Sequence, residues 1–153
     1  MDGLAPDPMR RKRQMEAVAR FPAADLLSAY AAISSDAPAA RAVRGPEVGL
    51  VMVRGRAGGG GRPFHLGEAS VVRATVMLDT GEVGHAMILG RDRERARMAA
   101  HLDALWQRDD WQARVEQDVV EPAERLRAAT ERREAEEAEA TRVDFFTLAR
   151  GED

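Results

Sequence analysis

Four consecutive glycines flanked by arginines form the segment of this sequence best suited to binding chemistry. Backbone N–H groups in a glycine-rich loop can surround an anion such as phosphate, and guanidinium groups add charge and paired hydrogen bonds. The residues that would form such a site are Arg54, Arg56, Gly58, Gly59, Gly60, Gly61 and Arg62. A P-loop requires Lys-Ser/Thr at the start of a helix, whereas here Gly61 is followed by Arg-Pro-Phe and a strand-like run. Two interpretations remain, an anion site and a simple connection between strands.

No other group of residues points to catalysis. The chain has no cysteine, which excludes thiolate catalysis and cysteine metal sites. Its histidines, His65, His85 and His101, are too far apart in sequence for a standard metal motif, and structural roles are favoured for His85 and His101. No serine lies in the Gly-x-Ser-x-Gly context of a hydrolase. We therefore predict no catalytic residue and no metal site.

Composition indicates one soluble globular domain. The chain has 153 residues, of which 44% are hydrophobic, enough to bury a core. The formal net charge of −3 argues against nucleic-acid binding, which usually needs a basic surplus. No segment approaches the roughly 20 apolar residues that span a membrane, and no signal peptide is recognisable, so we expect a cytoplasmic protein without membrane contact. Residues 1–8 are expected to be disordered.

The hydrophobic pattern predicts an α+β fold with N-terminal helices, a central antiparallel sheet and a C-terminal helical arm. Residues 34–46, with Gly45-Pro46, are expected to form a connection. Asp92 is the expected N-cap of the helix after the sheet. The predicted helices are 9–20, 23–33, 93–108, 111–120 and 124–140, with a restart at Pro122, and the predicted strands are 48–53, 70–78 and 83–89.

The C-terminal segments differ from the rest of the chain. Residues 124–140 are rich in alanine and charge, with few large apolar side chains, so this helix is either solvated or lies along a partner. The following residues 141–151 contain two of the four phenylalanines. An exposed apolar tail would be adhesive. It therefore either folds back onto the core or docks on another chain.

Four ordered motifs, taken together, resemble the PhnG family, a subunit type of the bacterial carbon–phosphorus lyase complex. They are RQMEAVAR at 13–20, GLVMVRGRAGGGGRPFHLGEASVVRA at 49–74, TGEVGHAMILGRDRERARMAAHLDAL at 80–105 and TRVDFFTLARG at 141–151. The resemblance covers nearly the whole chain. A mild departure is Met15, where the family often has an aromatic residue.

The resemblance implies an accessory subunit that assembles with PhnH-, PhnI- and PhnJ-type subunits in phosphonate breakdown. The complex uses ATP, and an alkylphosphonate displaces its adenine to give a ribose 1-phosphonate 5-triphosphate. The chemistry belongs to partner subunits, so this chain is expected to bind no cofactor and to be inactive alone. Residues 121–153 are then expected to form a partner-binding arm, with contacts through Val143, Asp144, Phe145, Phe146, Leu148 and Arg150. The alternative is that the glycine loop forms an anion-binding wall of a shared active site.

Overall fold

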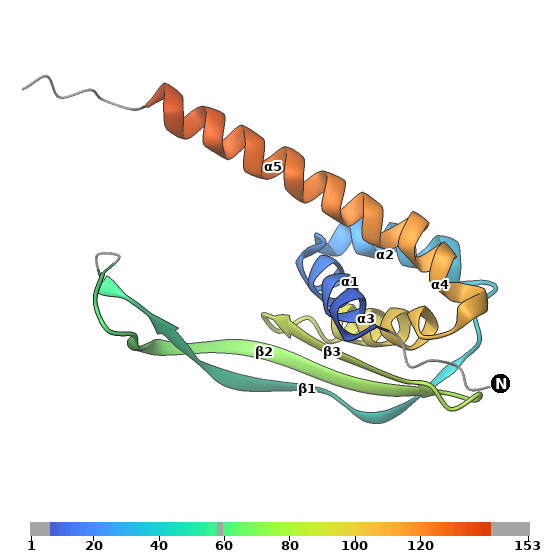
Figure 1. Ribbon diagram of the computed structural model, residues 1–153. Helices are drawn as coiled ribbons and strands as arrows, with labels where there is room; N and C mark the ends of the chain where they lie inside the picture. Colours follow the sequence, from blue (N-terminus) through green and yellow to red (C-terminus); the bar gives the residue numbers. More distant parts are fainter. Residues whose placement is uncertain (1–6, 58–59, 142–153) are drawn as a thin grey trace, which may run out of the picture.

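The computed structural model describes residues 7–57 and 60–141, and it has a sheet with helices on one face (Figure 1). This arrangement confirms the predicted α+β class. In chain order the elements are α1 (Pro8–Arg20), α2 (Ala23–Ser34), β1 (Ala40–Gly55), β2 (Phe64–Leu78), β3 (Val83–Leu89), α3 (Arg93–Trp106), α4 (Asp109–Val115), the π-helical turn η2 (Glu116–Val120) and α5 (Glu121–Ala140).

The sheet is an antiparallel meander in the order β1-β2-β3. The last two predicted strands are confirmed as antiparallel neighbours, and the turn at residues 79–82 joins them in a hairpin. β2 is longer than predicted, because it starts at Phe64 rather than Ser70. Phe64 to Ala69 pair with the second half of β1, and they extend beyond the end of β3, whose last residue Leu89 pairs with Val71.

The prediction of a connection at residues 34–46 was wrong for its second half, because β1 begins at Ala40. Gly45-Pro46 is a turn signal in isolation, but here it lies within irregularities of the strand between Ala42 and Glu47. Proline lacks an N–H donor and is tolerated on an edge strand, which β1 is. Gly45 takes a positive φ of 68°, a conformation that glycine adopts without steric cost.

The core lies between the sheet and α3. One face of β2 contributes Val72, Ala74, Val76 and Leu78, all almost fully buried. Every residue of α3 from Met98 to Trp106 is buried, so this helix is enclosed on all sides rather than amphipathic. Helices α1, α2 and α4 pack around it.

The first residues of several helices follow local sequence rules. Asp7 accepts a hydrogen bond from the Met9 amide, and Pro8 is the first residue of α1. These two residues are therefore ordered, contrary to the expectation for residues 1–8. Residues 1–6 lie outside the described chain. Asp92 caps α3 as predicted. Pro122 lies in the first turn of α5, but the predicted break before it is absent, because α4, η2 and α5 follow one another directly.

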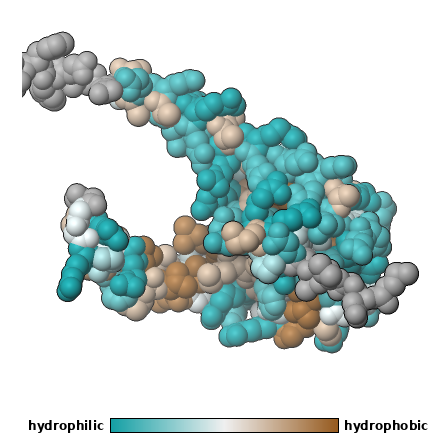
Figure 2. Space-filling model, in the orientation of Figure 1, coloured by the Kyte–Doolittle hydropathy of each residue, from teal (hydrophilic) through white to brown (hydrophobic). Residues whose placement is uncertain are grey.

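Two elements project from the body on the same side (Figure 1). One is the projecting hairpin, defined here as residues 49–57 and 60–70, where β1 and β2 pair only with each other. The other is α5, of which only Ala123 is buried. A hollow separates the two (Figure 2).

Gly84 is the position where α3 comes closest to the sheet. A β-carbon at this residue would overlap the carbonyl oxygen of Ala100 and would lie 2.6 Å from the amide nitrogen of Ala104. Both obstacles are backbone atoms, which cannot rotate away. We expect Gly84→Ala to lower the free energy of unfolding by about 3 kcal/mol, measured by urea denaturation. Gly60→Ala is the matched control, because a β-carbon there meets nothing within 4 Å. Equal stability of the two variants would contradict the packing.

Candidate functional site

The projecting hairpin exposes large apolar side chains. Val48, Leu50 and Met52 pair with Val72, Ser70 and Glu68, so they lie on the sheet face that carries the core. No helix of the described chain covers them there, since Leu50 and Met52 are 61% and 60% exposed. The other exposed apolar residues of this segment are Val53, Phe64 and Leu66. We call Val48, Leu50 and Met52, which share the core-side face of the sheet, the hairpin surface.

The hairpin surface faces a gap rather than solvent alone. In Figure 2 hydrophobic side chains line the hairpin on the side toward the hollow, whereas the opposing α5 is mostly hydrophilic. Contiguous exposed apolar side chains on a soluble protein commonly mark an interaction surface. Strands β1 and β2 hold them on a paired backbone whose other half is anchored in the core, so the surface is presented on a supported element.

The described residues of the predicted anion loop lie at the tip of this hairpin. Gly60, Gly61 and Arg62 follow the end of β1, and Arg56 and Arg62 are exposed. No ion pair involves Arg54, Arg56 or Arg62 within the described chain. The connection joins two antiparallel strands and opens no helix, as predicted. Gly58 and Gly59 lie outside the described residues, so the shape of the complete loop stays a prediction.

The arm is helical as predicted and is attached to the body at its base. Arg13 of α1 donates two hydrogen bonds to Glu124, with N···O distances of 2.7 and 2.6 Å, and one to Glu116 at 3.1 Å. Along its length α5 carries ion pairs between residues four apart, such as Glu121–Arg125 at 3.6 Å. The predicted contact residues Val143, Asp144, Phe145, Phe146, Leu148 and Arg150 lie outside the described residues.

A buried ionic cluster, which the sequence analysis missed, joins three elements. Asp103 of α3 has a side chain only 1% exposed, and it accepts hydrogen bonds from Arg11 Nε at 3.0 Å and from a terminal nitrogen of Arg11 at 2.7 Å. It also accepts from the backbone N–H of His85 in β3, at 2.8 Å. Arg11 and Gln107 both donate to the carbonyl of Val83. The carboxylate therefore holds α1 and β3 against α3.

The histidines do not form a common site, and no group of possible metal ligands occurs among the described residues. His101 is buried on α3. Its Nε2 lies 2.8 Å from the carbonyl oxygen of Pro38 and therefore donates, so Nδ1 of the neutral ring accepts from the Tyr30 hydroxyl at 2.7 Å. His85 contacts the Thr75 hydroxyl at 3.2 Å on the outer face of the sheet. These contacts confirm the structural role that was favoured for His101.

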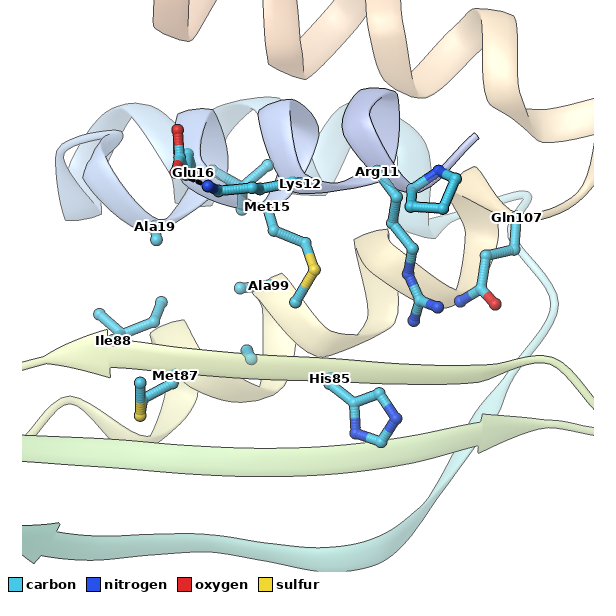
Figure 3. A pocket seen from close by; sticks show the side chains of 13 residues that line it. Arg11, Lys12, Met15, Glu16, Ala19, His85, Met87, Ile88, Ala99 and Gln107 are labelled. Carbon is cyan, nitrogen blue, oxygen red and sulfur yellow. Dashed lines mark ion pairs between the residues drawn. The ribbon is translucent and has the colours of Figure 1, made fainter. Parts of the chain in front are cut away.

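A second surface feature is a groove between α1 and the free edge of β3 (Figure 3). Its volume is about 740 Å³, and Met15 and Ala19 of α1 line it opposite residues 85–88. In Figure 3 the Met15 side chain points from α1 toward the sheet. The lining is mainly apolar. The sequence pattern does not predict this groove, because its two walls are separated by some seventy residues of chain.

Comparison with known proteins identifies the family. Residues 9–151 match the model of the family described as phosphonate metabolism protein PhnG. The chain is also 56% identical over 144 residues to "Alpha-D-ribose 1-methylphosphonate 5-triphosphate synthase subunit PhnG" of Rhizobium meliloti (strain 1021), covering 94% of this chain and 91% of the relative. The chain belongs to the PhnG family.

The four PhnG motifs can now be placed on the structure. The motif at 13–20 lies on α1, the motif at 49–74 forms most of the projecting hairpin, and the motif at 80–105 comprises β3 and α3. Only Thr141 of the last motif is described. No helix among the described residues is long and apolar enough to cross a membrane. The PhnG motifs thus contain the hairpin, much of the groove lining and Asp103, whereas its partner Arg11 precedes the first motif.

His101 predicts a pH dependence of stability. Burial lowers the pKa of this imidazole below its ordinary value of 6.5, more than its hydrogen bond to Pro38 raises it. As the pH falls below about 6.5, the unfolded chain takes up a proton before the folded chain does. The stabilisation is therefore complete above that pH and is lost below it.

We expect the urea midpoint of the wild type to fall more than that of His101→Gln between about pH 7 and about pH 5. His65→Gln, at an exposed position on β2, is the matched control. Parallel pH profiles of the wild type and His101→Gln would contradict this role for the buried ring.

Proposed function

We propose that this chain is an assembly subunit of a phosphonate-processing synthase complex, with PhnH-, PhnI- and PhnJ-type partners. The observation that carries the proposal is the hairpin surface: large apolar side chains, more than half exposed at Leu50 and Met52, on a strand pair that leaves the core. A partner that covers this surface would remove the apolar area from water, which is the main favourable term in protein association. Its relative is named as a synthase subunit, which supports this role.

The arm supports the same proposal from a second element. A helix of 20 residues extends about 30 Å, and α5 buries only its first turn against the body. A charged helix of this kind does not stabilise the fold of its own chain beyond that turn. Its C-terminal end lies away from the core (Figure 1), and Phe145, Phe146 and Leu148 follow it in the sequence. The arm and the hairpin would then hold a partner between them and beside the tail.

In the proposed complex, displacement of adenine from ATP by an alkylphosphonate takes place on partner subunits. The described residues of this chain form no metal cluster, and its buried carboxylate Asp103 is engaged by Arg11. Its buried histidine, His101, has both ring nitrogens occupied by structural partners. These groups are held for folding, which favours an accessory role. The isolated chain should release no adenine from ATP and methylphosphonate.

The hairpin surface provides the test of assembly. We expect the double variant Leu50→Glu, Met52→Glu to recover at least about tenfold less partner when a tagged chain is co-expressed with the other subunits. The matched control is Leu27→Glu, Met9→Glu, which changes a leucine and a methionine of similar exposure, 57% and 72%, on the helical body. Deleting residues 141–153 should weaken recovery as well. Normal recovery with both the hairpin variant and the truncation would refute the assembly role, as would adenine release by the chain alone.

A second function is favoured by one observation, the exposure of Arg56 and Arg62 at the hairpin tip without ion-pair partners in the described chain. We infer that this tip could form an anion-binding wall of an active site completed by a partner. Changing both residues to glutamine would then leave assembly intact but weaken ATP binding by the complex. Arg91→Gln, Arg93→Gln removes the same charge from another exposed pair and is the control. ATP affinity equal in the two double variants would exclude the wall.

A further inference from the structure

The outer edge of β3 is only partly satisfied. In an antiparallel ladder, backbone groups point alternately toward each neighbouring strand. The Gly90 amide bonds to Ser70 of β2, and the His85 amide bonds to Asp103 on the opposite side, so the odd-numbered residues of β3 direct their groups away from β2. The carbonyl of Val83 and the amide of His85 are bonded to side chains. Within the described chain, the Met87 amide and carbonyl and the Leu89 amide have no partner on that edge.

Apolar side chains flank this open edge on both faces of the sheet. On the inner face the groove is lined by Met15, Ala19 and Ile88. On the outer face Met87 and Leu89 are 57% and 71% exposed. Methionine at the mouth of the groove can adapt to an incoming side chain, because it is unbranched and flexible. The edge therefore offers backbone hydrogen bonds and, on either side of them, apolar contacts.

We propose that an extended segment of a partner subunit pairs with β3 from His85 to Leu89 and becomes the fourth strand of the sheet. This inference rests on the proposed role in a complex, and it adds a second docking site with a stated ligand chemistry. The segment is about five residues long at roughly 3.3 Å per residue and is apolar on both faces. Its inward side chains enter the groove below α1, and its outward side chains cover Met87 and Leu89.

The position of α1 beside β3 favours a single strand as the occupant over a second copy of this chain. Edge-to-edge pairing of two β3 strands about a two-fold axis would bring the α1 helix of each copy over the same position beside β3. In one copy this position is occupied by the groove of about 740 Å³ between α1 and β3. A single strand would bring no helix into the space below α1, whereas a second copy would bring its own α1 there. The edge is also continuous with the projecting hairpin, since Leu89 pairs with Val71 where the hairpin leaves the body.

Met87→Pro tests the main-chain pairing directly. Proline removes only the N–H that points away from β2, and it is tolerated at such positions of edge strands. Met87→Ala is the matched control, because it shortens the same side chain and keeps the N–H. With the full chain co-expressed with the PhnH-, PhnI- and PhnJ-type subunits, we expect Met87→Pro to bind the partner about tenfold more weakly than Met87→Ala, the effect of one lost hydrogen bond.

Hydrogen exchange of the wild type supplies a readout that needs no variant. The amides of Met87 and Leu89 should exchange at least about tenfold more slowly in the complex than in the isolated chain.

Equal binding by the proline and alanine variants, or unchanged exchange at these amides, would overturn the proposal. So would a dimer of the isolated chain that Met87→Pro dissociates. If the hairpin variant releases the partners while β3 exchange is the same free and bound, this inference fails and the assembly role stands. If the wild type recovers no partner, both fail.

Discussion

The arrangement of this protein depends on one buried carboxylate. Asp103, in the enclosed part of helix α3, binds Arg11 of α1 through both carboxylate oxygens. It also accepts a hydrogen bond from the backbone N–H of His85. A buried charge that loses its partner is strongly destabilising, so these elements stabilise one another's positions. The cluster fixes α1 beside the edge of the sheet without covering it. The groove between α1 and β3 is thus a consequence of how the core is held together.

The two projections are continuations of elements that are anchored in the body. β2 is one continuous strand whose second half lies in the core and whose first half supports the projecting hairpin. The helix α5 follows η2 without interruption, and Arg13 holds its base through Glu124 and Glu116. Neither projection has a core of its own. Each is a regular element anchored at one end, which places apolar or charged surface at a distance from the body and in a defined direction.

Local patterns predicted the elements that follow local rules. The 3.6-residue period gave the helices, the turn at 79–82 gave the last hairpin, and Asp92 was correctly assigned as an N-cap. The first half of β1 was missed because Gly45-Pro46 is a turn signal unless a neighbouring strand accommodates it. Asp103 and His101 were missed as buried groups because the helical period identifies one apolar face, whereas α3 is enclosed on every side. Their burial depends on polar partners far away in the sequence, Arg11 for Asp103 and Tyr30 for His101.

The sequence by itself determined the α+β class, the order of the elements and, through motifs read in order along the chain, the family. These properties depend on residues that are near one another in sequence or on their succession. Only the tertiary structure decided which polar groups are paired and which apolar surfaces stay uncovered. Arg11 and Asp103 are 92 residues apart, and the exposure of Leu50 depends on where the helices end above the sheet. Gly60 and Gly61 accordingly lie at the tip of a long hairpin, because β1 and β2 pair far beyond the core.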